Sequence, residues 1–433
     1  MSIQVTDGES VVVKRSRRRG CSIALGVFSL FLGAYALIFF SDVGPGDDSD
    51  LLPPSAPAVP LEENMAYWVG EALEGIGETN LDPVVGAWLC DPKFEPQEFA
   101  ARSTEVAKFV QANSARFEAI ERAARCRVSI ASRQFANWTE LCSIHRLIAI
   151  GVHHRIAEGD RGRAIQLLLS SRYLMKTTGH LSGGVMGEEA CIRAWHYLIQ
   201  TETDPSRLRS LQKHFEDPIF EADWEEQWVK ETYRVSKDLW DDPEAARQFL
   251  EEVAFYVPEF GLSPLFYRHS RTHAKFADQC RQFLEEAERG EPLRLPAPKA
   301  AGWRRSLRVL GGNSAGEILL EIISDSTKFG WDSTRDVLAT DRMIQVMIGL
   351  QLHQLRTERY PRTLAELVPE FLSEVPRDPD DPQGGPLRWD SDRRVLWSFG
   401  RGQADDGGKR SSRSREYSPS WLDDDDRTMS FPP

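Results

Sequence analysis

The feature that most constrains this chain is a proline-punctuated stretch near its end, residues 334–408. It opens with apolar residues at helical spacing, such as Val337 and Leu352, which predict an amphipathic helix over 334–358. Tyr360-Pro361 ends this helix, because the residue before a proline is pushed out of the α region. The stretch is therefore expected to begin as a long helix that stops at a defined point.

Turn and cap signals follow the helix. Thr363 and, three residues later, Glu366 form a capping box, in which each side chain satisfies an orphan backbone donor. Two β-prone runs within 387–399, separated by a polar turn, predict a β-hairpin. Between the short capped helix and this hairpin, Pro376, Pro379 and Pro382 predict an extended, turn-rich passage without regular structure. We expect a small α+β module over 331–433.

The order of these parts resembles the C-terminal half of the major pseudopilin of type II secretion. It is also similar to a group of membrane-anchored bacterial proteins that carry the same ending after a large helical region. The likeness covers about the last 90 residues and rests on several elements at fixed spacing. Those elements are Tyr360-Pro361, Arg377-Asp378-Pro379, Gly385-Pro386, Trp397-Ser398-Phe399-Gly400 and Asp405-Asp406-Gly407-Gly408.

The resemblance implies a calcium ion in the last loop. Hard cations bind several oxygen ligands on a flexible loop. The ligands expected here are Asp405, Asp406, carbonyls around 398–403 and one of Asp423–Asp426, taken as Asp424. The chain departs from the family pattern at Arg401-Gly402-Gln403, where the first acidic position is expected, and at Trp397, where the family has tyrosine. The alternative is an acidic turn that holds no ion.

The start of the chain predicts a membrane anchor. Residues 21–40 carry no charge, and a helix of this length spans about 30 Å, the thickness of the bilayer's hydrocarbon core. The basic cluster within 1–20 places the N-terminus in the cytoplasm by the positive-inside rule. We expect a transmembrane helix over 21–41, followed by an extended linker rich in Pro, Gly and Asp over 42–60. A cleaved signal peptide is the alternative, although its apolar core is normally shorter.

Residues 61–330 show a helical signal almost throughout. Asp204-Pro205, Asp242-Pro243 and Ser263-Pro264 each place an N-cap residue before a proline at the first helical position. No fixed repeat length is present, which argues against a regular solenoid. The fold class is mainly α, with a large extracytoplasmic helical domain. Its periodic runs are 98–124, 137–158, 163–177, 187–201, 221–239, 243–256 and 264–289.

Composition excludes some classes of function. The net charge of −13 argues against binding of nucleic acid by a basic face. None of the six cysteines forms a CxxC pair, which argues against a zinc knuckle or a thioredoxin-type motif. With Cys21 in the apolar segment, an odd number remains, so not all can pair within the chain: Cys90, Cys126, Cys142, Cys191 and Cys280.

One motif suggests catalysis. Gly312-Asn313-Ser314-Ala315-Gly316 fits the GxSxG pattern of a nucleophile elbow, with Ser314 as the nucleophile. The only histidine downstream is His353, and the alternative is that Asn313 or Ser314 caps a helix. We expect ordinary surface or capping roles for the four paired histidines, His153, His154, His269 and His273, because zinc would need a further ligand.

These features favour a non-enzymatic, membrane-anchored scaffold or interaction protein of the bacterial cell envelope. Its expected place is the inner membrane, with a cytoplasmic N-terminus and most of the chain outside, where it would bind a partner protein. In its finer form, the expectation is a role accessory to a secretion or pilus-like assembly. Two alternatives remain open: a serine hydrolase using Ser314, and a peptide-binding helical array.

Overall fold

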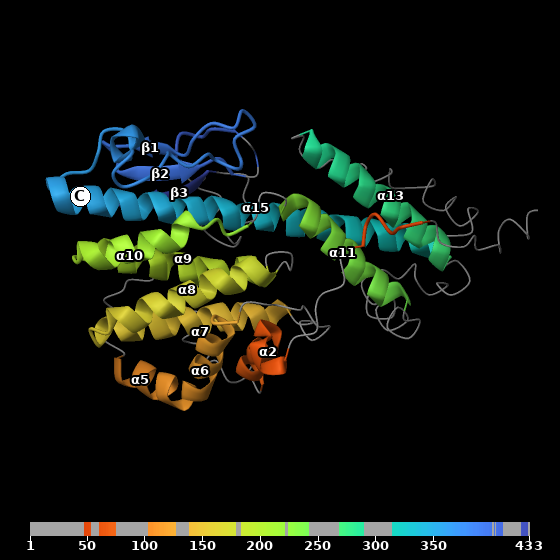
Figure 1. Ribbon diagram of the computed structural model, residues 1–433, viewed down its shortest axis with the longest axis horizontal. Coiled ribbons are helices and arrows are strands. Elements are labelled where there is room, and N and C mark those ends of the chain that lie inside the picture. Colours follow the sequence, from red (N-terminus) through yellow and green to blue (C-terminus); the bar gives the residue numbers. More distant parts are fainter. Residues whose placement is uncertain are drawn as a thin grey trace, which may run out of the picture. The chain divides into compact units, whose positions relative to one another are not determined.

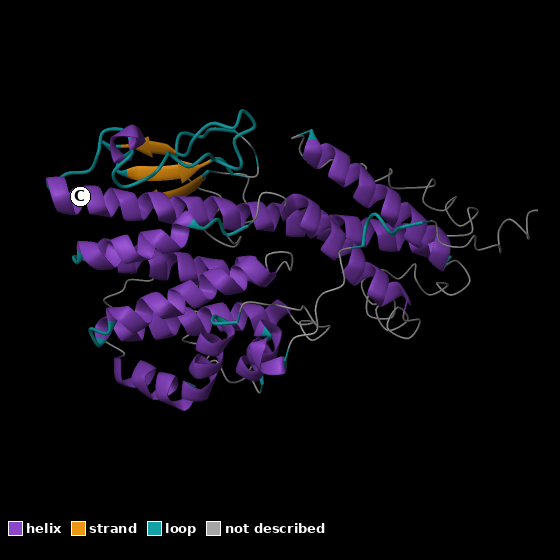
Figure 2. Ribbon diagram, viewed as in Figure 1, coloured by secondary structure: helices purple, strands orange, loops and turns teal. Residues whose placement is uncertain are grey.

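The computed structural model describes residues 47–52, 60–74, 103–126, 138–178, 183–220, 224–241, 268–289, 314–400, 402, 404–409 and 426–431. In this part the protein is mainly helical, with a small three-stranded sheet (Figures 1 and 2), as the predicted fold class requires. The predicted anchor, 21–41, lies outside the described ranges. Within those ranges, every helix is too short or too polar to cross a membrane.

The chain forms two compact units. The first comprises Met1–Pro53 and Val229–Asp325, and the second comprises Pro54–Trp228 and Ser326–Pro433. The domain boundary expected at residue 330 instead falls inside one continuous helix, α15 (Ser314–Thr357).

Helix α15 begins 20 residues before the expected start at 334. Ser326, Thr327 and Gly330 are weak helix formers, so the sequence gives this segment little helical signal. In the structure the helix continues through the polar residues that follow. Ser333 and Thr334 are buried, and the Thr334 hydroxyl donates to the Gly330 carbonyl at 2.9 Å. Such bonds to the carbonyl four residues back let a threonine remain within a helix.

The helices of the second unit are α2 (Met65–Leu73), α5 (Ser103–Ala112), α6 (Ser114–Ala123), α7 (Trp138–Ala157), α8 (Arg161–Thr178), α9 (Gly183–Thr201) and α10 (Pro205–Glu216). The single run predicted over 98–124 is divided at Asn113. The Asn113 amide donates to the Phe109 carbonyl at 2.9 Å and accepts from Arg116 at 2.6 Å. Asparagine side chains compete in this way with the helical backbone, so two helices form in place of one.

The predicted start of α10 is confirmed. Asp204 is the N-cap, Pro205 is the first helical residue, and the Asp204 carboxylate accepts from the Ser206 N–H at 2.9 Å. The other two proline-marked starts, 242–243 and 263–264, lie outside the described residues.

The C-terminal module begins with the short 3-10 helix η4 (Leu364–Leu367), which has the predicted capping box of Thr363 and Glu366. The predicted hairpin is confirmed as β1 (Arg388–Asp390) antiparallel to β2 (Val395–Ser398). The sequence did not predict β3 (Arg427–Ser430), which pairs with the other side of β2, so the strand order is β1-β2-β3.

One apolar core runs through most of the second unit. It includes Met65 on α2, Trp195 on α9, Ile348 on α15 and Leu396 on β2. Figure 1 shows the C-terminal part of α15 between the strands on one side and α8–α10 on the other. The module therefore shares its core with the helices, and the expected division into domains at 61–330 and 331–433 is not a division between separate cores.

The first unit contains α13 (His269–Glu288), most of α11 (Trp224–Asp241) and the first part of α15. Its segment 47–52 differs from the expected extended linker over 42–60. Leu51 is fully buried, and Asp48 accepts from the Tyr233 hydroxyl at 2.8 Å. Arg281 donates to the Asp50 carboxylate at 2.8 Å. Asp48 and Asp50 of the predicted linker therefore pair with cations and a hydroxyl of α11 and α13.

Candidate functional site

The proline-rich passage before β1 is ordered by its own aspartates. Asp378 Oδ1 accepts from the Asp380 N–H at 3.0 Å, and Asp381 Oδ1 accepts from the Gln383 N–H at 2.7 Å. The Asp378 N–H donates to the Gly385 carbonyl at 2.8 Å. Short side chains of this kind close turns over two or three residues, so the passage reverses direction without forming a helix or strand.

Asp378 joins this passage to strand β2. Its carboxylate is buried, accepts from the Ser398 hydroxyl at 2.7 Å, and accepts from the Phe399 N–H at 2.8 Å. Burial raises the pKa of Asp378, while the hydrogen bonds from Ser398, Phe399 and Asp380 act in the opposite direction. The predicted Ser398-Phe399 motif therefore serves as a pair of donors to an internal carboxylate.

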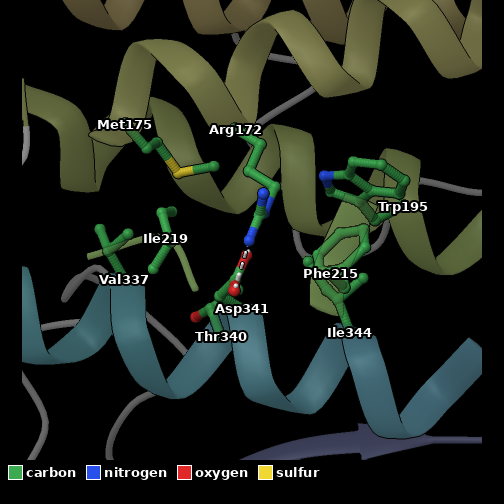
Figure 3. A pocket seen from close by; sticks show the side chains of 9 residues that line it. All are labelled: Arg172, Met175, Trp195, Phe215, Ile219, Val337, Thr340, Asp341 and Ile344. Carbon is green, nitrogen blue, oxygen red and sulfur yellow. Dashed lines mark hydrogen bonds and ion pairs between the residues drawn. The ribbon is translucent and has the colours of Figure 1, made fainter. Parts of the chain in front are cut away.

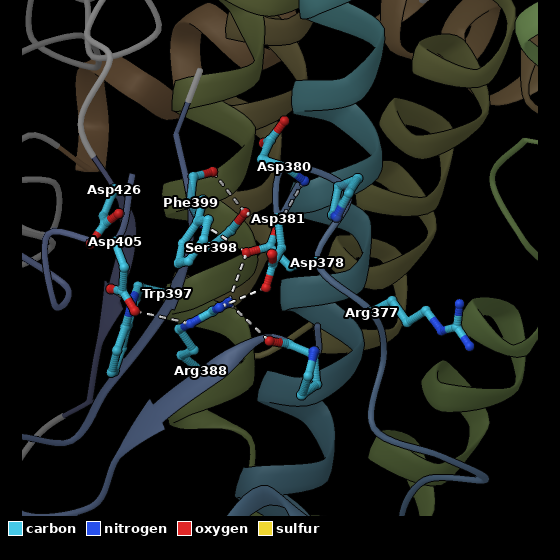
Figure 4. A network of polar contacts seen from close by, with 12 residues as sticks. Arg377, Asp378, Asp380, Asp381, Arg388, Trp397, Ser398, Phe399, Asp405 and Asp426 are labelled. Atoms are coloured by element: carbon cyan, nitrogen blue, oxygen red, sulfur yellow. Dashed lines mark hydrogen bonds and ion pairs between the residues drawn. The ribbon is translucent and has the colours of Figure 1, made fainter. Parts of the chain in front are cut away.

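The Arg388 guanidinium lies at the centre of the network (Figure 4). Its Nη2 donates to Asp381 Oδ2 at 2.6 Å, and its Nε lies 3.1 Å from Asp405 Oδ2. Its Nη1 lies 3.5 Å from Asp378 Oδ2. Burial raises the pKa of Asp381, but the hydrogen bond from Arg388 and other contacts outweigh this effect and lower it overall. The planar guanidinium of arginine carries five N–H donors, so it can contact several carboxylates at once.

The loop after β2 is closed around Asp405. The Asp405 Oδ1 atom accepts from the Trp397 Nε1 at 3.1 Å and from the Gly407 N–H at 2.9 Å. Arg393 donates to the carbonyls of Gly407 and Gly408 at 2.6 and 2.8 Å. Gly408 has a φ of +66°, and a Cβ there would lie 3.1 Å from the Trp397 ring, so glycine is required.

Of the calcium ligands that the pseudopilin resemblance implies, Asp405 and Asp406 lie among the described residues. Both Asp405 oxygens already face donors, Asp406 is exposed, and Asp424 lies outside the described residues. Across the described ranges, no three His, Cys, Asp or Glu side chains converge in a way that would hold a metal ion.

Asp426 is a nearby carboxylate in the acidic run Asp423–Asp426, from which one ligand was expected. It is buried, its Oδ2 accepts from the Gly408 N–H at 2.8 Å, and its Oδ1 has no hydrogen-bond partner. Burial raises the pKa of Asp426, and the charges of Asp405 and Asp406 add to this effect. The environment of Asp426 therefore favours its neutral form more than that of an exposed aspartate does.

Ser314 and His353 belong to the same helix, α15, but are 39 residues apart in the chain and fall in different units. The His353 Nδ1 instead lies 2.9 Å from the Arg359 carbonyl and 3.1 Å from the Thr357 hydroxyl. Ser314 is the first residue of α15, and Asn313 lies outside the described residues.

The paired histidines are more buried than expected. His153, His154 and His273 are buried, so the expectation of surface positions is wrong for these three. The His273 and His269 rings stack with centroids 6.0 Å apart, and the His273 Nε2 lies 2.8 Å from the Tyr233 hydroxyl. Burial lowers the pKa of His153 to about 4.

A buried ion pair was missed by sequence reasoning. Arg172 on α8 donates through Nε to Asp341 Oδ1 on α15 at 2.6 Å (Figure 3). Its Nη2 donates to the Asp217 carbonyl at 2.7 Å. The adjoining cavity is about 10 Å³, enough for one water and too small for a substrate. The Trp195 Nε1 lines it and has no hydrogen-bond partner. Because the two residues are far apart in the chain, no local sequence motif predicts this ion pair.

Comparison of the chain with protein-family models, with curated proteins and with solved structures finds no match. The resemblance to the pseudopilin module stays a prediction that rests on the motifs themselves. Among the described residues of the module, the Arg388 guanidinium contacts three carboxylates, and one of them, Asp405, belongs to the predicted calcium loop.

Proposed function

We propose that this protein is a non-enzymatic, membrane-anchored scaffold or interaction protein of the bacterial cell envelope. The basic segment and the uncharged run 21–40 support an anchor with a cytoplasmic N-terminus. In this proposal, the helical array and the C-terminal module lie outside the cytoplasm and bind a partner protein.

The observation that carries the proposal is the shared core of the module and the helices. Strand β3 meets α9, where the His196 Nε2 lies 2.6 Å from the Ser430 carbonyl and the Gln200 amide donates to the same carbonyl at 3.0 Å. Arg427 on β3 also pairs with Asp336 on α15. A module joined in this way is held in a fixed orientation on its support, as a docking platform requires.

The finer form of the proposal is a role accessory to a secretion or pilus-like assembly. Its support is the order of parts shared with the pseudopilin module: a long helix ending at Tyr360-Pro361, a capped short helix, a hairpin and a Gly-Asp loop. The loops around 377–386 and 404–409 present exposed side chains beyond the sheet. We expect the partner to contact these loops.

Site-specific photo-crosslinking in bacterial cells tests the proposal. A benzoylphenylalanine replaces Gln383, an exposed residue of the module, in the full-length chain. The matched control carries the same group at Glu118, an exposed position on α6. We expect a discrete adduct in the membrane fraction from position 383 and none from position 118. Equal labelling at both positions, or no adduct from position 383, would count against a partner on the module.

A further inference from the structure

We infer that Arg388 is an internal cation that joins the two loops of the C-terminal module, in place of the metal ion that the pseudopilin resemblance implies. This inference concerns how the module is ordered and does not depend on the proposed envelope function. It follows from the mismatch between the calcium scheme and the donors present, and from the contacts that the guanidinium makes.

The first argument is the origin of the carboxylates. Asp378 and Asp381 belong to the passage before β1, whereas Asp405 belongs to the loop after β2. All three lie within 3.5 Å of a guanidinium nitrogen of Arg388. A calcium ion orders a loop by drawing oxygen ligands from separated positions to one positive centre. Here a side chain of the protein provides that centre.

The second argument is the way Arg388 is held. It lies directly opposite Trp397 in the β1–β2 register, and the Trp397 Nε1 donates to the same Asp405 carboxylate that Arg388 contacts. The guanidinium lies 3.7 Å from the centre of the Phe399 ring, and its Nη1 donates to the Pro386 carbonyl at 3.1 Å. Cation–π contact and bonds to fixed acceptors keep the charge in one place.

Both oxygens of Asp405 already have donors beside them. Its Oδ1 faces two donors and its Oδ2 faces Arg388. A metal at this carboxylate would compete with the Arg388 Nε for Oδ2. The order of both loops is therefore expected to be independent of calcium.

Hydrogen exchange measured by mass spectrometry on the full-length chain in detergent tests this inference. We expect equal exchange for peptides covering 378–385 and 404–409 in calcium chloride and in a calcium chelator. Arg388→Met should speed exchange in both peptides, because one side chain contacts both loops. The matched control is Arg393→Met on the same hairpin, whose guanidinium donates to the Gly407 and Gly408 carbonyls and lies 3.8 Å from Asp390, outside both peptides. It should speed exchange in the 404–409 peptide alone.

Two results would overturn the inference. One is slower exchange of the native chain in calcium, which would show that a metal orders the loop. The other is an Arg388→Met pattern confined to one loop. If Arg388→Met does not fold, Arg388→Lys keeps the charge and loses the fork, and should still speed exchange in both loops. The calcium comparison on the native chain needs no variant.

Discussion

At the scale of residues, the second unit contains charges that are almost removed from water. The Arg172 and Asp341 side chains are 6% and 10% exposed, and the Arg172 guanidinium also lies 4.6 Å from the Phe215 ring. Breaking such a pair by removing one partner leaves a buried charge without compensation. By contrast, an exposed ion pair contributes little, because water and salt screen it.

Arg172→Met should therefore lower the free energy of unfolding by about 3–5 kcal/mol. The matched control is Arg125→Met, which breaks an exposed pair with Glu121 in which Arg125 is 75% exposed, and should cost about 1 kcal/mol or less. Urea denaturation followed by circular dichroism measures both. Similar losses in the two variants would show that the buried pair is not a special contributor to stability.

A second prediction at this scale concerns pH. The pKa of His153 in the folded protein is about 4, below the ordinary value of 6.5, so acid protonates the unfolded state first. The contribution of neutral His153 to the free energy of unfolding is fully present above about pH 6.5. It is lost as the pH falls towards 4, a loss on the order of 3 kcal/mol.

His153→Gln removes the titrating group and should flatten this part of the stability profile, measured by urea denaturation across the same pH window. His154→Gln is the control, because His154 is on the same helix and also has a pKa lowered chiefly by burial, although only His153 shows a large shift. A profile for His153→Gln as steep as that of the native chain would show that other groups cause the acid sensitivity.

At the scale of elements, helix ends are set by local chemistry that can be tested directly. The Asp204 carboxylate caps α10 through the Ser206 N–H at 2.9 Å. Asp204→Ala should lower the free energy of unfolding by about 0.5–2 kcal/mol, the usual loss when an N-cap residue is replaced by alanine. Glu216→Ala is the control at the other end of α10, where a negative charge opposes the helix dipole, so removing it should be neutral or slightly stabilising. Thermal unfolding of the two variants gives the comparison, and equal effects would argue against capping.

At the scale of the whole molecule, the proposed topology makes a clear prediction. If the N-terminus is cytoplasmic and 21–41 spans the membrane, a reporter fused after Pro433 lies outside the cytoplasm. A reporter that is active only in the cytoplasm should be silent there. The same reporter placed before the apolar segment is the control and should be active. Reporter activity at the C-terminal position would contradict both the predicted membrane anchor and the proposed place in the cell envelope.

Local signals in the sequence were sufficient for several elements. Asp204-Pro205 predicted the start of α10, Tyr360-Pro361 the end of α15, and the capping box and hairpin of the module were found where expected. Each depends on a few neighbouring residues: a proline without an N–H, a capping carboxylate, or alternating apolar residues beside a polar turn. Such interactions form in the same way whatever the rest of the chain does.

The tertiary structure decided the features that need distant partners. Strand β3 exists because β2 offers it a free edge, and α15 runs on through Gly330 with Ser333 and Thr334 buried. The predicted ligand Asp405 is one of three carboxylates around Arg388, but Arg388 itself was missed because these carboxylates come from two separate segments of the chain. Whether an aspartate faces water, a metal or an arginine depends on which groups the folded chain brings near it. The residues next to it in the sequence do not determine that partner.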